Sequence, residues 1–210
     1  MKDIYLLSGL GADHRIYEFV DFTGYHVHHV TWIKPLKDEK IENYARRLLE
    51  QIPDAKPTLI GVSFGGVMCV EIGKIIDTEK IILISSVRHV DQVPSRYKTI
   101  GKWALHKLMP VRFLKMVTPL TYWSFGTKTK TEKQLLRTII KETDEDFLRW
   151  AVDKVLNWQN ETLVSNVIQI NGTADRIYPF TKADHIIKRG GHWMVRDNAE
   201  EISRIIREII

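Results

Sequence analysis

The feature that most constrains the fold is a serine set between glycines, in Gly61-Val62-Ser63-Phe64-Gly65. The apolar run Pro57–Ile60 precedes it, and an apolar stretch of helical character begins at Val67. A serine in a tight strand-to-helix turn has a strained backbone and projects its oxygen away from the sheet. The residues two positions before and after it must be small, because strand and helix approach closely there. The pattern therefore predicts a nucleophilic Ser63, followed by a Phe64 amide at a helix N-terminus that can stabilise an oxyanion.

Short apolar runs of strand length recur along the chain and alternate with helical patterns. Such alternation indicates a mostly parallel sheet with helices on both faces, which is an α/β architecture. We expect about six strands. The runs are Ile4–Leu7, Val27–Val30, Thr58–Ile60, Ile81–Ile84, Val167–Ile170 and Ile186–Ile187.

Two helices have clear signals. Apolar residues follow helical spacing from Ile41 to Ile52, and again through the C-terminal segment, where Asn198 is a candidate N-cap with Glu201 three residues later. Between residues 88 and 159 no convincing strand appears, and prolines and a glycine separate helical stretches. We therefore expect a core formed by residues 1–87 and 160–210, with residues 88–159 as a helical cap insertion.

A serine nucleophile needs a base and an orienting carboxylate. Of the eight histidines, His192 has the most suitable frame, Gly190-Gly191-His192, just after the last short strand. Asp175 lies where another strand runs into a polar loop, which would place its carboxylate at the same sheet edge. Asp91 is a weaker candidate for the acid. The alternatives are a capping serine, a surface histidine and a turn-forming aspartate.

A second oxyanion donor is expected in an earlier strand-to-helix loop. Ser8-Gly9-Leu10-Gly11 ends the first strand, and its glycines would let the Leu10 amide approach a ligand closely. The same segment could begin a dinucleotide-binding fingerprint, but His14 occupies the position of the third glycine.

These motifs and their order resemble those of small members of the α/β-hydrolase superfamily. The resemblance rests on Ser8–Gly11, Gly61–Gly65, Asn171–Arg176 and Gly190–His192, which together span nearly the whole chain. It implies Ser63 as nucleophile, His192 as base and Asp175 as its partner, with the Leu10 and Phe64 amides as oxyanion hole. Two departures are Ser8, where many relatives carry histidine, and the absence of the two N-terminal strands common in larger members.

Composition indicates the class of protein and the role of its single cysteine. The chain has 210 residues, of which 44% are hydrophobic and 27% charged, as in an ordinary globular protein. Cys69 is the only cysteine and lies among apolar residues, which predicts a small core residue. We find no transmembrane segment or secretory signal, so we expect a cytoplasmic protein. No metal or organic cofactor is implied.

Residues 96 to 141 carry eleven Lys or Arg and one acid, within a chain of net charge +5. This charge has three interpretations: a solvated helix surface, attraction of an anionic or carrier-linked substrate, or contact of Trp103–Met109 and Phe113–Met116 with an anionic membrane. Nucleic acid binding is not expected, because no binding motif accompanies the basic segment. The segment is also aromatic, and we expect more than half of its rings to pack onto the sheet. The rest could line an apolar pocket for an acyl or aryl group.

The leading functional hypothesis is a serine hydrolase that cleaves a carboxylic ester or thioester through an acyl-enzyme intermediate. The same triad could instead perform lyase chemistry or hydrolyse a C–C bond. A third hypothesis is a non-catalytic ligand-binding module that retains the pocket.

Overall fold

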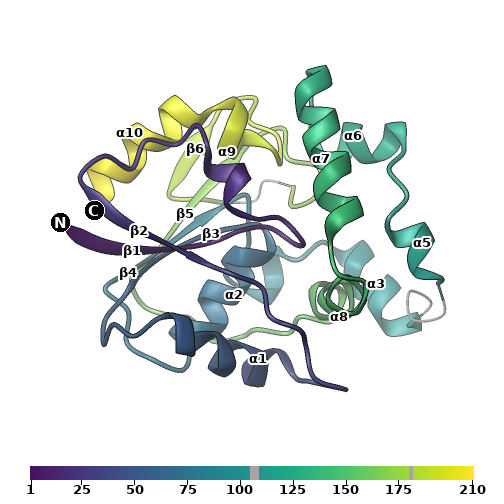
Figure 1. Ribbon diagram of the computed structural model, residues 1–210, viewed down its shortest axis with the longest axis horizontal. Helices are drawn as coiled ribbons and strands as arrows, with labels where there is room; N and C mark the ends of the chain where they lie inside the picture. Colours follow the sequence, from purple (N-terminus) through teal and green to yellow (C-terminus); the bar gives the residue numbers. More distant parts are fainter. Residues whose placement is uncertain (105–108, 180–181) are drawn as a thin grey trace.

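A twisted parallel sheet forms the centre of the computed structural model, which describes residues 1–104, 109–179 and 182–210 (Figure 1). Its six strands lie in the order β2-β1-β3-β4-β5-β6, and each neighbouring pair is parallel. All six predicted strands are present and extend slightly beyond their apolar runs. Their bounds are Lys2–Leu7 (β1), Tyr25–Val30 (β2), Thr58–Val62 (β3), Lys80–Ile84 (β4), Val167–Gly172 (β5) and His185–Ile187 (β6).

Alternate residues of the strands face two separate hydrophobic clusters, one on each side of the sheet. Tyr5 and Leu7 of β1 belong to the cluster beneath α1 (Ile41–Leu48) and α2 (Phe64–Gly73). Ile4 and Leu6 belong to the cluster that contains α10 (Ala199–Ile209). Because side chains alternate across a strand, a sheet buried on both faces requires the nearly continuous apolar runs seen in the sequence.

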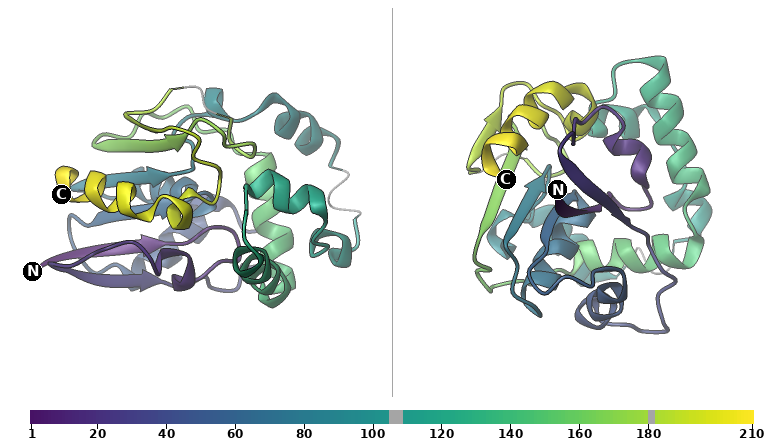
Figure 2. Two further views of the ribbon diagram at one scale, coloured as in Figure 1. Left: turned by 90° about the horizontal axis from the view of Figure 1, so that it is seen from above. Right: turned by 60° about the vertical axis from the view of Figure 1, so that its left-hand side comes forward.

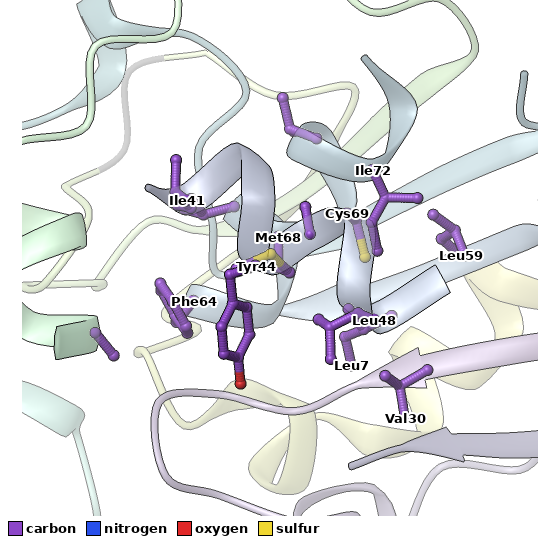
Figure 3. Packing of buried hydrophobic residues seen from close by; sticks show 14 of the residues in the cluster. Leu7, Val30, Ile41, Tyr44, Leu48, Leu59, Phe64, Met68, Cys69 and Ile72 are labelled. Atoms are coloured by element: carbon purple, nitrogen blue, oxygen red, sulfur yellow. The ribbon is translucent and has the colours of Figure 1, made fainter. Parts of the chain in front are cut away.

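The helix that follows Ser63 is buried on all sides. Residues Phe64 to Ile72 of α2 are all buried, between the sheet on one side and α1 and the insertion on the other. Figure 3 shows Met68, Cys69 and Ile72 pointing into this cluster with Tyr44 and Leu48 of α1. The predicted helix over Ile41–Ile52 is an α-helix only to Leu48, and residues 49–51 continue as one 3₁₀ turn.

In the described part of the segment expected to be inserted, five α-helices lie between β4 and β5. They are α3 (Ser95–Trp103), α5 (Val111–Leu114), α6 (Pro119–Phe125), α7 (Lys130–Glu142) and α8 (Glu145–Leu156). They lie at the end of the sheet away from both termini (Figures 1 and 2). The boundaries at 88 and 159 stay a prediction, and α8 packs into the same cluster as α1 and α2. Residues 105–108 of the segment considered for membrane contact lie outside the described residues.

Asn198 occupies the N-cap position of α10, but its side chain makes no capping hydrogen bond. Its backbone ψ of 30° directly follows the short helix α9 (Met194–Asp197), so the chain enters α10 from a helical turn and not from an extended segment. A capping side chain normally requires an extended backbone, so the predicted capping box does not form.

Candidate active site

Ser63 sits in the predicted strained turn between β3 and α2. Its φ of 53° and ψ of −117° lie outside the regions that most side chains adopt. A Cβ on Gly65 would overlap the carbonyl groups of Leu7 and Ser8, and a Cβ on Gly61 would lie 2.5 Å from the backbone of Gly65. The two glycines therefore allow β1, β3 and α2 to meet at one point.

Hydrogen bonds of the Ser63 amide and carbonyl groups also hold the turn in place. The Ser63 amide donates to the Ile84 carbonyl at 2.9 Å, and the Ser63 carbonyl accepts from the Val67 amide and, at 2.6 Å, from the Ser86 hydroxyl. Ser86 follows β4, the neighbouring strand, and its side chain lies where a Cβ on Gly66 would clash. The strain at Ser63 is thus stabilised by contacts from the adjacent strand.

His192 reaches Ser63 from the loop after β6. Its Nε2 lies 2.9 Å from the Ser63 Oγ. The loop runs close to β5, where a Cβ on Gly172 would overlap the Gly190 carbonyl. Phe125 of α6 meets the imidazole edge to face, with ring centroids 5.4 Å apart. The ring is thereby fixed between the sheet edge and the insertion, with only 4% of its side chain exposed.

Asp175, in the loop after β5, is the carboxylate that contacts His192. Its Oδ2 lies 2.9 Å from His192 Nδ1, and its Oδ1 accepts from the amides of Ile177 and Tyr178 at 2.8 and 3.0 Å. An ionised carboxylate only accepts hydrogen bonds, so Nδ1 carries the imidazole proton and Nε2 is left to accept from the serine hydroxyl. This is the arrangement in which a histidine can deprotonate a serine.

The two amides expected to bind an oxyanion belong to Leu10, in the loop after β1, and to Phe64, the residue after Ser63. Leu10 shares a cavity with Ser63, and a Cβ on the neighbouring Gly9 would lie 3.8 Å from the Ser63 Cβ. Phe64 begins α2, where the amides of the first turn have no partner within the helix. In the described part of the chain, neither the Leu10 nor the Phe64 amide donates a hydrogen bond. Both are therefore available to an acceptor on a ligand.

Asp91 and Cys69, which the sequence left as weaker alternatives, lie away from this group. The Asp91 carboxylate is 83% exposed and lies 3.1 Å from His89, not near His192. The Cys69 thiol is fully buried in α2, and burial raises its pKa well above the usual range for a thiol. A buried thiol of that kind is neither ionised nor reachable, so it is not a nucleophile.

A small apolar cavity of about 70 Å³ opens beside Ser63 and His192. Its roof comes from α7, through Leu136, Ile139 and Ile140. The remaining wall is almost entirely apolar and comes from four other parts of the chain: Ala12 and Ile16, Val62, Phe125, and Trp193 and Val195. Ser63 and His192 also line it and bring a hydroxyl and an imidazole to the cavity.

Solved structures with a similar fold are known. A lipase-esterase related protein from Clostridium acetobutylicum matches 100% of this chain and 94% of its own, with a TM-score of 0.71 at 15% sequence identity. The chain has the α/β-hydrolase fold. A thermophilic esterase from Thermogutta terrifontis matches 99% of this chain and 89% of its own (TM-score 0.67, 14% identity). A bromoperoxidase from Bacillus anthracis matches 99% of this chain and 91% of its own (TM-score 0.67, 16% identity). No protein-family model matches, and no curated protein matches the sequence.

In this α/β-hydrolase fold, the aromatic residues of the insertion divide in two. Six of the nine rings pack onto the two clusters, and three are largely exposed, so the expectation that more than half would pack is met. The packed rings are Tyr97, Tyr122, Phe125, Phe147, Trp150 and Trp158, and the exposed ones are Trp103, Phe113 and Trp123. Among the described helices, none combines the length and apolar character needed to cross a membrane.

Sequence reasoning missed the wall of the cavity and the role of Ser86. Leu136 and Ile139 repeat at helical spacing, which is equally typical of a residue that only packs. Ile16 and Val195 come from opposite ends of the chain and have no local signal at all. Ser86 is the second residue after the apolar strand β4, beside the strand that leads to Ser63, and that position is a signal that could have identified it.

Proposed function

We propose that this protein is a serine hydrolase that cleaves carboxylic esters or thioesters of short, apolar acyl groups through an acyl-enzyme intermediate. The observation that carries the proposal is the continuous hydrogen-bonded chain from the Ser63 Oγ through His192 to the Asp175 carboxylate, with both links at 2.9 Å. A serine, a histidine and a buried carboxylate in this order are the parts that acyl transfer requires.

In the first half of the reaction, the Ser63 Oγ attacks the substrate carbonyl while its proton passes to His192 Nε2. The Asp175 carboxylate holds the imidazole in the productive orientation and stabilises the imidazolium that forms. The Leu10 and Phe64 amides donate hydrogen bonds to the tetrahedral oxyanion. Collapse of this intermediate breaks the bond to the alcohol or thiol, which leaves with the proton from Nε2.

In the second half, water replaces the leaving group. His192 takes a proton from the water as it attacks the acyl carbonyl, and the second tetrahedral intermediate is held by the same two amides. The proton then returns to the Ser63 Oγ as the acid is released. The leaving group needs only to accept the proton from His192 Nε2, so the same steps apply to an ester and to a thioester.

The size of the cavity limits the acyl group. An apolar cavity of roughly 150 Å³ accommodates benzene, whereas the cavity beside Ser63 has about 70 Å³. We therefore expect acyl chains of about two to four carbons, each methylene adding about 0.8 kcal/mol of binding while it fits. Because α7 supplies the roof, we propose that residues 88–159 act as a cap that sets this limit.

The test is hydrolysis of p-nitrophenyl acetate by the wild type and by Ser63→Ala, with Cys69→Ala as the matched control. Loss of the nucleophile should lower kcat by roughly 10⁴-fold or more. Removing the buried thiol, which no step uses, should leave kcat unchanged. Unchanged turnover in Ser63→Ala would refute the proposal.

A further inference from the structure

Large apolar side chains are exposed on α3, α5 and α6 and in the turn that follows α5. The group includes Ile100, Trp103, Phe113, Met116, Leu120 and Trp123, and the exposed fraction reaches 71% for Trp103 and 66% for Leu120. The three helices follow one another along the edge of the molecule farthest from the termini (Figures 1 and 2). Soluble proteins rarely expose several large apolar residues on neighbouring elements, and where they do the surface commonly has a partner.

Uncompensated positive charge accompanies these side chains. From Arg96 to Thr131 the sequence contains no Asp or Glu. Among the described residues, Lys115 and Lys128 face carboxylates, Glu145 at 3.7 Å and Asp197 at 3.1 Å.

Lys102, Arg112 and Lys130, by contrast, are exposed and have no carboxylate partner within the described residues. Apolar and basic groups also lie side by side locally, because the Arg112 guanidinium stacks 5.2 Å from the Phe113 ring. We call these six apolar and three basic residues the apolar–basic face.

An anionic bilayer satisfies both properties of this face. Exposed Trp, Phe and Leu side chains enter the boundary between head groups and acyl chains, while Lys and Arg pair with lipid phosphates. A second copy of the chain fits less well, since two identical faces would bring their positive charges together. We propose that the apolar–basic face docks reversibly on an anionic phospholipid bilayer. This contact is independent of the hydrolytic function proposed above.

Vesicle sedimentation of the full chain tests the proposal, using phosphatidylcholine alone or equal parts phosphatidylcholine and phosphatidylglycerol. The wild type should bind only the anionic vesicles, and added salt should weaken binding. Trp103→Ala/Leu120→Ala should bind at least tenfold more weakly, because it removes two apolar side chains from the face. The matched control is Leu36→Ala/Leu163→Ala. Leu36 and Leu163 are 60% and 79% exposed but do not belong to the apolar–basic face, so this variant should bind the vesicles like the wild type.

A second pair of variants tests the charge. Lys102→Ala/Arg112→Ala should weaken binding roughly 30-fold, from about fivefold for each cation near an anionic surface. Lys56→Ala/Lys188→Ala removes the same net charge from elsewhere and should have a much smaller effect. Thermal melting by circular dichroism establishes that each variant is folded.

Three results would overturn the proposal. They are no binding to anionic vesicles, an equal loss in the matched controls, and a concentration-dependent dimer that the Trp103→Ala/Leu120→Ala variant abolishes. The last result would assign the face to a second copy of the chain. Vesicle sedimentation does not depend on turnover. A protein without hydrolase activity could still bind the vesicles, and an active hydrolase could fail to bind them, so the two proposals are tested separately.

Discussion

Leu136→Ala tests whether the α7 roof sets the length of the acyl chain. Leu136 is 2% exposed and lines the cavity beside Ser63, so truncation removes three carbon atoms from the roof. The space gained should accept about three more methylenes. At about 0.8 kcal/mol for each buried methylene, this amounts to about 2.4 kcal/mol, or roughly 60-fold in kcat/KM.

The assay compares kcat/KM for p-nitrophenyl acetate, butyrate, hexanoate and heptanoate. The wild type should lose activity beyond butyrate. Hexanoate has two methylenes more than butyrate, so Leu136→Ala should raise the ratio of hexanoate to acetate by roughly 15-fold, and the full gain of roughly 60-fold should be reached with heptanoate. The variant should also be less stable, by about 3 kcal/mol in urea unfolding, because a buried leucine is lost.

Leu135→Ala is the matched control. Leu135 is the preceding residue on α7 but is only partly buried and lines a separate groove near His14. Its truncation should leave the chain-length profile unchanged. An unchanged profile in Leu136→Ala, or an equal shift in Leu135→Ala, would refute the assignment of this cavity to the acyl group.

Three further predictions follow from the site and the core. Asp175→Asn should lower kcat by about 10⁴-fold, since an amide favours the wrong imidazole tautomer, and steady-state kinetics showing less than a tenfold loss would contradict this. Gly65→Ala should lose about 3 kcal/mol in urea unfolding, because the new Cβ overlaps the Leu7 and Ser8 carbonyls. Gly24→Ala is the control, because its new Cβ meets only open space; it should lower the free energy of unfolding by about 1 kcal/mol, owing to the positive φ. Equal losses of stability in Gly65→Ala and Gly24→Ala would refute the steric explanation. Burial raises the pKa of Cys69, so a disulfide reagent at about pH 8 should modify it only in denaturant, and rapid modification of the native protein would contradict its burial.

The central strands of the sheet could be predicted from the sequence because they are buried on both faces, whereas the edge strands β2 and β6 keep exposed residues. A doubly buried strand must be apolar at consecutive positions, so runs such as Ile81–Ile84 stand out from the amphipathic helices around them. Helix ends were harder. The apolar spacing continues to Ile52, but the backbone tightens into a 3₁₀ turn after Leu48. Leu49 still packs against the core cluster and Ile52 lies within it, so the apolar pattern does not mark where the α-helix ends.

The candidate site was predictable where a glycine marks a close approach of the backbone. Gly61 and Gly65 flank the serine turn, and Gly190 precedes His192 where the loop touches β5. The cavity beside Ser63 had no such mark. Its walls include Ile16, Leu136 and Val195, which come from three distant segments, and each would look the same in a sequence if it only filled the core.

The central claim is that Ser63 is an activated nucleophile, and the most direct test is covalent labelling by a fluorophosphonate followed by peptide mass spectrometry. We expect one label per chain, located on Ser63, and no label on Ser63→Ala or His192→Ala, since the hydroxyl is a poor nucleophile without its base. A folded wild-type protein that takes up no label, or one labelled equally in His192→Ala, would contradict the account.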